Sequence, residues 1–245
     1  MSTSTKTALV TGASRGIGAA IAARLAKDGF NVIVNYSGSE ASASDVIADI
    51  EAAGGKAVPA QADISDPEAV KRMFDIAEVA FGGVDVLVNN AGIMKLSLIA
   101  QVDNAQIDRQ IDINLKGSIN TMREAAKRLR DGGRVVNLSS SVVGTRFETY
   151  GVYAATKSAV EVLTTVLAKE MRGRNITVNA VAPGPTGTDL FLDGKSAELV
   201  DRLAKANPLE RLGKPDDIAG VVAFLAGPDG GWVNGQVLRA NGGMV

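Results

Sequence analysis

The chain has 245 residues, 46% of them hydrophobic, with a formal net charge of −1 and a sequence pI of about 5.6. This length and hydrophobic content predict a single domain, residues 1–245, with a full-sized core, and the near-neutral charge gives no electrostatic reason to expect a nucleic-acid partner. Because the sequence contains neither cysteine nor histidine, it excludes disulfides, thiol and imidazole catalysis, a Ser-His-Asp triad and most zinc sites, so we expect no metal.

The chain opens with a short polar stretch at residues 1–6, which is not a signal peptide, and no apolar run reaches membrane-spanning length. We therefore expect a cytoplasmic protein with no membrane partner.

Apolar β-branched runs alternate with longer amphipathic runs along the rest of the chain. The predicted strands are residues 7–11, 31–35, 56–61, 84–88, 134–138, 176–181 and 236–239. The predicted helices are residues 16–28, 40–53, 65–81 with a capping box at Ser65 and Glu68, 104–130, 152–171 and 216–225, whereas 189–206 is polar and mixed. Pro59 places the third strand near an edge of the sheet. Continuous apolar strands that are each followed by a helix predict an α/β fold, a single doubly wound parallel seven-stranded sheet with helices on both faces (a Rossmann fold).

A glycine-rich turn joins the first strand to the first helix. Its sequence, Gly12-Ala-Ser14-Arg15-Gly16-Ile17-Gly18, is a variant of the dinucleotide fingerprint. Glycines let the backbone approach a pyrophosphate closely, and the start of the helix supplies free N–H groups. These residues predict a dinucleotide site.

The end of the second strand indicates which dinucleotide is bound. It reads Asn35-Tyr36-Ser37-Gly38-Ser39, with no carboxylate to hold an adenosine 2′-hydroxyl. Arg15, with Ser37 or Ser39 as donors, suits a 2′-phosphate, so we favour NADP(H) over NAD. The alternative is that Arg15 lies in solvent and Ser39 only caps the second helix.

Tyr153 and Lys157 lie four residues apart on a predicted helix, so their side chains share one face. An ammonium beside a phenol favours the phenolate and lowers the pKa of the tyrosine. Because this spacing is common, the pair gains meaning only from its neighbours in the sequence.

Taken together, these motifs resemble the classical short-chain dehydrogenase/reductase family over the whole chain. The resemblance rests on residues 11–18, 89–92, Asn114, the run Ser139-Ser140-Ser141, Tyr153 with Lys157, and Pro183-Gly184. The closest likeness is to 3-oxoacyl-[acyl-carrier-protein] reductases and related NADPH carbonyl reductases.

The resemblance implies a role for each motif. Tyr153 protonates a carbonyl oxygen as hydride arrives from the nicotinamide, while Lys157 lowers its pKa and holds the nicotinamide ribose. A serine after the fifth strand donates to the same oxygen, and Asn114 positions a water, or else bonds backbone where its helix bends. The further cofactor-binding residues that the resemblance implies are Asp63 and Ile64 beside the adenine, Asn90, Ala91 and Gly92 along the cofactor, and Pro183, Gly184, Thr186 and Thr188 at the carboxamide end.

The catalytic serine has two candidates. The step from Ser141 to Gly144 matches the usual local pattern, whereas the usual distance back from Tyr153 points to Ser140. Because the intervening loop can vary in length, we favour Ser141.

Three segments bound the expected substrate site, residues 93–96, 143–150 and the stretch after Thr188, which has the composition of a mobile lid. Their apolar residues favour a small-molecule carbonyl substrate that is hydrophobic. Arg128, Arg130, Arg172 and Arg174 are candidate contacts for an acyl-carrier protein, or they complement helix dipoles. The alternatives to a general carbonyl reductase are a dedicated 3-oxoacyl-[acyl-carrier-protein] reductase and a non-catalytic NADP-binding regulator. Surplus apolar faces on the helices at 104–130 and 152–171, together with the resemblance, predict a homotetramer.

Overall fold

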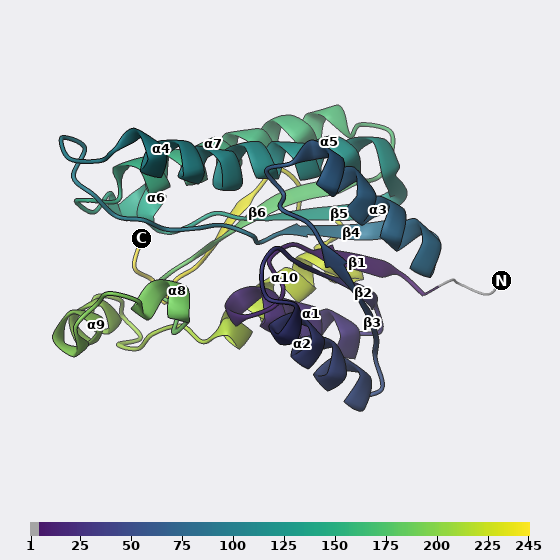
Figure 1. The fold of residues 1–245 in the computed structure, drawn as a ribbon, viewed down its shortest axis with the longest axis horizontal. Coiled ribbons are helices and arrows are strands. Elements are labelled where there is room, and N and C mark those ends of the chain that lie inside the picture. The colour runs from purple at the N-terminus through teal and green to yellow at the C-terminus, as the bar shows by residue number, and fades with distance from the viewer. Residues whose placement is uncertain (1–4) are drawn as a thin grey trace.

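The computed structural model describes residues 5–245, and within these residues seven strands form one parallel sheet (Figure 1). The strands are β1 (Thr7–Val10), β2 (Asn31–Tyr36), β3 (Lys56–Gln61), β4 (Val84–Asn89), β5 (Leu129–Leu138), β6 (Thr177–Pro183) and β7 (Val237–Ala240). Their order across the sheet is β3-β2-β1-β4-β5-β6-β7. The predicted sheet is confirmed, and Pro59 lies in an edge strand as expected.

Helices cover both faces of the sheet. One layer contains α1 (Gly16–Lys27), α2 (Glu40–Ala52) and α10 (Pro215–Ala226), and the other contains α3 (Pro67–Phe81), α5 (Ser118–Arg128) and α7 (Gly151–Glu170) (Figure 1). Along β1, Ala8 and Val10 belong to the core of the first layer, whereas Leu9 belongs to the core of the second. Because both faces are buried, these strands must be apolar throughout. Among the helices of residues 5–245, none combines the length and hydropathy needed to cross a bilayer.

The strand order reverses between β1 and β4, which are adjacent in the sheet with Val10 opposite Val88. In open α/β sheets such a reversal leaves a crevice beyond the carboxyl ends of the strands. Three short helices lie at this end of the molecule, α6 (Val142–Thr145), α8 (Asp189–Leu192) and α9 (Ala197–Ala204) (Figure 1). The loops that follow the central strands therefore meet here.

The helix predicted over residues 104–130 is helical from residue 104 to 128 but is not α-helical throughout. It consists of α4 (Asn104–Gln110), a π-helical segment η1 (Ile111–Gly117) and α5, and β5 begins at Leu129 rather than at residue 134. Gly117 marks a close approach, because a Cβ at this position would lie 2.6 Å from the Ile64 side chain. π-helical turns of this kind are frequent at functional sites.

The start of α3 differs from the predicted capping box. Asp66 is the N-cap, and its carboxylate accepts a hydrogen bond of 2.9 Å from the backbone N–H of Glu68, with Pro67 in the first helical position. The Ser65 hydroxyl instead donates to Asp63 at 2.7 Å. A carboxylate at the N-cap also complements the helix dipole, so the acidic residue takes the place predicted for the serine.

A buried polar network attaches α5 and α7 to the centre of the sheet. Asn89 donates to the Asn137 side chain at 2.8 Å and accepts from Thr121 at 2.6 Å, and Asn137 donates to Thr164 at 2.9 Å. Each buried amide is thus hydrogen-bonded, which makes its burial tolerable and fixes the two helices over β4 and β5.

Candidate active site

The glycine-rich turn follows β1 and approaches the backbone of neighbouring segments very closely. Gly12 has φ +61°, and a Cβ there would lie 2.9 Å from the Ala91 backbone, while a Cβ on Gly18 would lie 2.3 Å from the Gly12 carbonyl oxygen. The Asn90 amide donates to the carbonyls of Thr11 and Gly12 at 2.9 and 3.0 Å. The loop is therefore held against the end of β4, and its glycines let the backbone come as close as the approach of a pyrophosphate requires.

The predicted cofactor residues line two adjoining cavities. We call the first, of about 460 Å³, the nucleotide cleft, and its lining includes Gly12, Ser14, Arg15, Gly16, Ile17, Gly18, Ser37, Ser39, Asp63, Ile64, Asn90, Ala91, Gly92 and Thr188. The second, of about 130 Å³, is the inner pocket, and its lining includes Tyr153, Lys157, Pro183, Gly184, Thr186 and again Thr188. Each predicted position thus lies at one of two connected spaces.

Asn35, at the end of β2, lines the cleft, although no motif in the sequence indicated a role for it. Its Oδ1 accepts from the Gly12 N–H at 3.1 Å, and its Nδ2 donates to the carbonyls of Ala60 and Ala62 at 3.0 and 3.1 Å. The side chain therefore attaches the glycine-rich turn to the end of β3. The signal in the sequence was an amide that ends an otherwise apolar strand.

The opposite wall of the cleft contains an ion pair that was not predicted. Arg109 Nη2 lies 3.3 Å from Asp63 Oδ2, and Ser65 donates to the other carboxylate oxygen. Although partial burial opposes the shift, the hydrogen bonds from Ser65 and Arg109 lower the pKa of Asp63. The predicted alternative for Ser39 is also observed, since its hydroxyl accepts from the Ser42 N–H at 3.3 Å and caps α2 while still lining the cleft.

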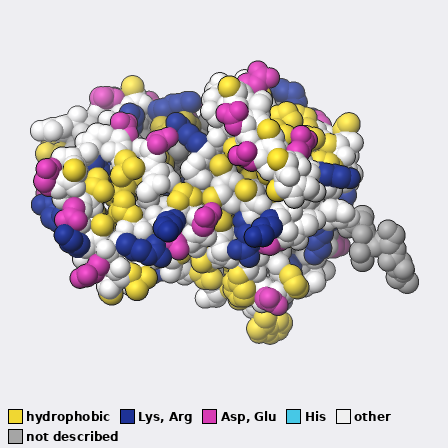
Figure 2. Space-filling view, turned by 90° about the horizontal axis from the view of Figure 1, so that it is seen from below, with side chains coloured by type: hydrophobic (Ala, Val, Ile, Leu, Met, Phe, Trp, Pro, Cys, Tyr) yellow, Lys and Arg dark blue, Asp and Glu magenta, His cyan; other side chains and the backbone are white. Residues whose placement is uncertain are grey.

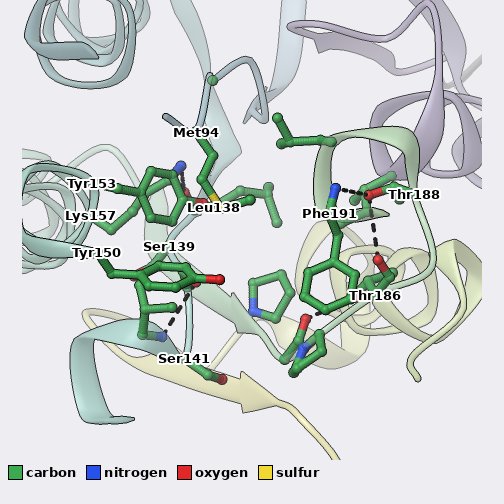
Figure 3. Close-up of a pocket in the computed structure, with 18 of the residues that line it drawn as sticks. Met94, Leu138, Ser139, Ser141, Tyr150, Tyr153, Lys157, Thr186, Thr188 and Phe191 are labelled. Carbon is green, nitrogen blue, oxygen red and sulfur yellow. Dashed lines mark hydrogen bonds between the residues drawn. The ribbon is translucent and has the colours of Figure 1, made fainter. Parts of the chain in front are cut away.

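Tyr153 and Lys157 are both buried and lie one turn apart on α7 (Figure 3). Lys157 Nζ donates to the Leu138 carbonyl at 2.7 Å and lies 5.8 Å from the centroid of the Tyr153 ring. The ammonium therefore connects α7 to the end of β5 and leaves two further N–H donors.

Burial controls the ionisation of both groups. It raises the pKa of Tyr153 to about 12, against a smaller lowering by a hydrogen bond with Ser140, and it lowers the pKa of Lys157 to about 8. Without a coenzyme, burial thus places the pKa of Tyr153 above its ordinary value, and Lys157 is not among the groups that lower it.

The serine run, Ser139–Ser141, sends its three hydroxyls to different partners. Ser139 donates to Glu161 on α7 at 2.6 Å, and Ser141 donates to the Ala182 carbonyl at 3.2 Å while accepting from Asn241 at 3.0 Å. Figure 3 shows the Ser141 side chain directed away from Tyr153 and Lys157.

Of the three serines, Ser140 is the one that acts on Tyr153, because it lowers the pKa of the phenol against the larger effect of burial. The hydroxyl of Ser141, the predicted donor, is engaged at β6 and near the end of the chain. The geometry therefore favours Ser140, the alternative that the spacing from Tyr153 indicated.

Asn114 lies in η1 and is fully buried. Its amide holds both backbone groups of Ile93, accepting from the N–H at 2.8 Å and donating to the carbonyl at 2.9 Å. On the preceding turns, Gln110 accepts from the Lys95 N–H at 3.2 Å and Gln106 donates to the Lys95 carbonyl at 3.2 Å. The alternative that Asn114 bonds backbone is therefore observed, and three amides together fix the 93–95 segment, which has no strand partner.

The expected substrate walls line the inner pocket. Its apolar lining residues include Met94, Phe147, Leu190, Phe191, Leu203 and Met244, with the Tyr150 ring 6.5 Å from the Tyr153 ring between centroids. The pocket shares Met94, Phe147, Tyr150, Leu190 and Leu203 with a wider outer groove between residues 93–96, 147–150 and 189–203. Figure 2 shows apolar side chains with charged ones around them over the end of the molecule that carries α8 and α9.

Comparisons with known proteins show what this chain is similar to. A family model described as enoyl-(acyl carrier protein) reductase matches residues 12–245. An NADPH-dependent aldehyde reductase-like protein of Arabidopsis thaliana is 43% identical over 98% of this chain and 94% of its own length. The 3-oxoacyl-[acyl-carrier-protein] reductase of Staphylococcus aureus is also 43% identical, over 98% of both chains. The structure of a short chain dehydrogenase from Burkholderia cenocepacia in complex with NADP has a TM-score of 0.91 and 42% identity, covering 98% of this chain and 97% of that one.

The burial of Lys157 predicts a specific dependence of stability on pH. Its folded pKa of about 8 lies below its ordinary value of 10.5, so the unfolded chain binds more protons between these values and the penalty for burying Lys157 disappears as the pH rises through that window. We expect Lys157→Met to be stabilised relative to the wild type by about 3 kcal/mol more at pH 7 than at pH 10.5.

Urea unfolding of both proteins across this pH range measures the difference. Lys169→Met, which replaces an exposed lysine of the same helix, is the control and should show no such trend. A constant difference between Lys157→Met and the wild type would show that Lys157 is solvated.

Proposed function

The chain belongs to the short-chain dehydrogenase/reductase family, and we propose that it reduces the carbonyl group of a hydrophobic ketone or 3-oxoacyl compound to an alcohol with NADPH. The observation that carries this proposal is the buried Tyr153 hydroxyl, with Ser140 and Lys157 beside it, in an apolar pocket that adjoins the nucleotide cleft. When bound in that cleft, NADPH supplies the hydride. The protein then has to place the ketone, exclude water and deliver a proton.

Proton delivery falls to Tyr153. Hydride addition leaves negative charge on the carbonyl oxygen, and two hydroxyl donors from Tyr153 and Ser140 stabilise that charge when they are fixed in advance. Lys157 holds its position through Leu138 and has N–H donors left for the ribose hydroxyls of the coenzyme.

The preference for NADPH rests on the end of β2. The cleft there contains Arg15, Ser37 and Ser39, and the exposed Arg15 has no ion-pair partner within residues 5–245. A guanidinium with hydroxyl donors suits a 2′-phosphate. The structure named for Burkholderia cenocepacia contains NADP, which supports the same preference.

A dedicated acyl-carrier-protein reductase is the weaker alternative. Arg128 pairs with Asp75 and Glu78, and Arg130 and Arg174 pair with Asp85 and Asp131 respectively. These arginines lie near the start of β5, whereas the serine run lies at its end. Within one chain, three of the four predicted arginines therefore form ion pairs with carboxylates, near the end of β5 that lies away from the pocket.

A non-catalytic regulator is disfavoured for a different reason. Burying Tyr153 and Lys157 shifts both pKa values in the direction that penalises the charged forms. A protein that only bound NADP would gain nothing from that cost, because neither side chain is required to hold the pyrophosphate.

We also propose that the chain is one domain and assembles as a homotetramer. All seven strands of residues 5–245 join one sheet, and Val162 and Val166 on α7 stay 60% and 44% exposed, one turn apart on the helix. Such an apolar face is suited to a second copy of the chain. A cytoplasmic location stays a prediction, since a relative from Arabidopsis thaliana is named as chloroplastic.

Tyr153→Phe tests the proposed reaction. We expect NADPH-dependent reduction of an activated ketone to lose about 10²- to 10⁴-fold in kcat, because the proton donor is removed. The Kd for NADPH should stay within about twofold, since the ring is retained. Steady-state kinetics and fluorescence titration measure the two quantities, and full turnover in the variant would refute the assignment of Tyr153.

Two serine variants test whether Ser140 or Ser141 is the donor. Ser140→Ala removes a donor to the developing oxyanion and should lower kcat about 10²-fold. Ser141→Ala should retain kcat within about tenfold, because its hydroxyl faces β6 and Asn241. The reverse order of effects in the same ketone assay would restore Ser141 as the donor.

Arg15→Ala tests the coenzyme preference. Losing a charge-assisted contact with a 2′-phosphate should raise the Kd for NADPH by about tenfold or more and leave that for NADH nearly unchanged. Arg24→Ala is the control, because Arg24 lies on α1, directly after the loop that contains Arg15, and pairs with Asp28 at 3.0 Å. Equal weakening of both coenzymes by Arg15→Ala would mean that Arg15 does not contact the phosphate.

A further inference from the structure

Met244 lines the inner pocket beside Tyr153 and the serine run, although no motif in the sequence pointed to it. It belongs to residues 241–245, which we call the terminal segment. This segment follows β7 and returns toward α6, where a Cβ on Gly144 would lie 2.9 Å from the Val245 side chain. The wall of the pocket therefore includes residues from the far end of the sequence.

Ser141 and Asn241 hold the terminal segment in this position. Asn241 is buried, and its Nδ2 donates to Ser141 Oγ at 3.0 Å and to the Val245 carbonyl at 3.3 Å. Its Oδ1 accepts from the N–H groups of Gly243 and Met244 at 3.0 and 3.2 Å. One amide thus closes the turn that presents Met244 and attaches it to the end of β5.

Two glycines let the chain fold back so tightly. Gly242 and Gly243 have φ values of +68° and +87°, a region that residues with a Cβ rarely adopt. A Cβ on Gly242 would lie 2.5 Å from Asn207 Oδ1, and one on Gly243 would lie 3.2 Å from the Pro208 ring. The terminal segment is therefore packed closely against the loop at residues 207–208.

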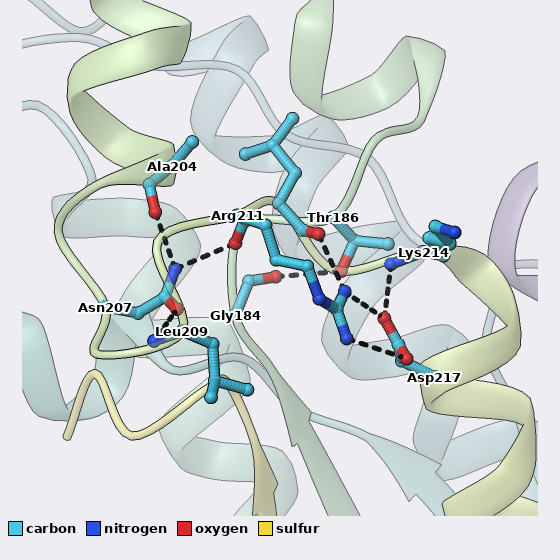
Figure 4. Close-up of polar contacts among 9 residues, drawn as sticks. Gly184, Thr186, Ala204, Asn207, Leu209, Arg211, Lys214 and Asp217 are labelled. Atoms are coloured by element: carbon cyan, nitrogen blue, oxygen red, sulfur yellow. Dashed lines mark hydrogen bonds and ion pairs between the residues drawn. The ribbon is translucent and has the colours of Figure 1, made fainter.

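That loop is itself well anchored (Figure 4). Asn207 donates to the carbonyls of Ala204, at the end of α9, and Arg211, at 2.8 and 2.9 Å. Arg211 in turn forms a two-pronged ion pair with Asp217 of α10, at 2.6 and 3.1 Å. The base on which the terminal segment rests is thus connected both to the helix beside the outer groove and to the main body of the protein.

We propose that the terminal segment is a specificity-determining wall in which Met244 limits the size of the ketone substituent that the inner pocket accepts. Ser141 and Asn241 act as positioning residues for Met244, which explains why a serine beside the catalytic one faces away from the reaction. The inference rests on the proposed ketone reduction. A thioether side chain suits this place, since methionine adapts its shape to apolar groups of different outline.

The test compares two β-keto esters that differ only in the ketone substituent, ethyl acetoacetate with a methyl group and ethyl benzoylacetate with a phenyl group. Shortening the wall with Met244→Ala should raise the ratio of kcat/KM for the phenyl ester to that for the methyl ester about tenfold, the scale of a few methylenes in an apolar pocket. Met244→Trp should lower the same ratio. Val245→Ala is the matched control in the same segment, and it should leave the ratio within about twofold.

Asn241→Ala tests the positioning role. Releasing the turn should raise the phenyl-to-methyl ratio in the same direction as Met244→Ala, with no further rise in the double variant, because both changes remove the same wall. Additive effects would show that Asn241 acts elsewhere.

The outcomes distinguish a failure of the proposed specificity wall from a failure of the proposed reaction. If the wild type reduces the methyl ester but Met244→Ala leaves the ratio unchanged, the wall is refuted while the proposed reaction stands. If the wild type reduces no ketone with NADPH, the proposed reaction itself fails. Circular dichroism and thermal unfolding confirm that each variant is folded before its ratio is compared.

Discussion

The hydrogen bond from Lys157 to the Leu138 carbonyl is the contact on which the site depends. It spans 2.7 Å between α7 and the last residue of β5, immediately before the serine run. Through it α7, which carries Tyr153, is attached to the end of β5, after which Ser140 follows. The cost is a buried amine whose pKa falls to about 8, and the network around Asn89 and Asn137 holds the same two elements together further along.

Local sequence does not determine which hydroxyl of the serine run faces Tyr153. The motifs placed a donor within three consecutive residues, and the strand pattern placed them at the carboxyl end of β5. Which hydroxyl faces Tyr153 depends on partners that are distant in sequence, Glu161 for Ser139 and Asn241 for Ser141. Local spacing contains no information about Asn241, which lies 100 residues away from Ser141. The fold was predictable because strand and helix periodicities are local, whereas this choice is tertiary.

The π-helical turn within the helix predicted at residues 104–130 has the same origin. Nothing in its apolar periodicity marks a π-helical turn at Asn114, because the extra residue is stabilised by contacts outside the helix. The amides of Gln106, Gln110 and Asn114 replace the strand partner that the 93–95 segment lacks. This arrangement satisfies backbone groups that would otherwise be costly to bury, and it fixes the wall that includes Met94.

Burial also explains how proton transfer can be tied to hydride transfer. With its pKa raised to about 12 by desolvation, the Tyr153 phenol is neutral at physiological pH and keeps its proton. A neutral phenol releases that proton readily only to an oxygen that has gained negative charge, or when a further cation besides Lys157 stabilises the phenolate. Both conditions would be met in the proposed reduction, because the hydride that bound NADPH would supply leaves negative charge on the ketone oxygen and positive charge on the nicotinamide. The burial that makes the tyrosine a poor acid in isolation would therefore make its acidity conditional on the reaction.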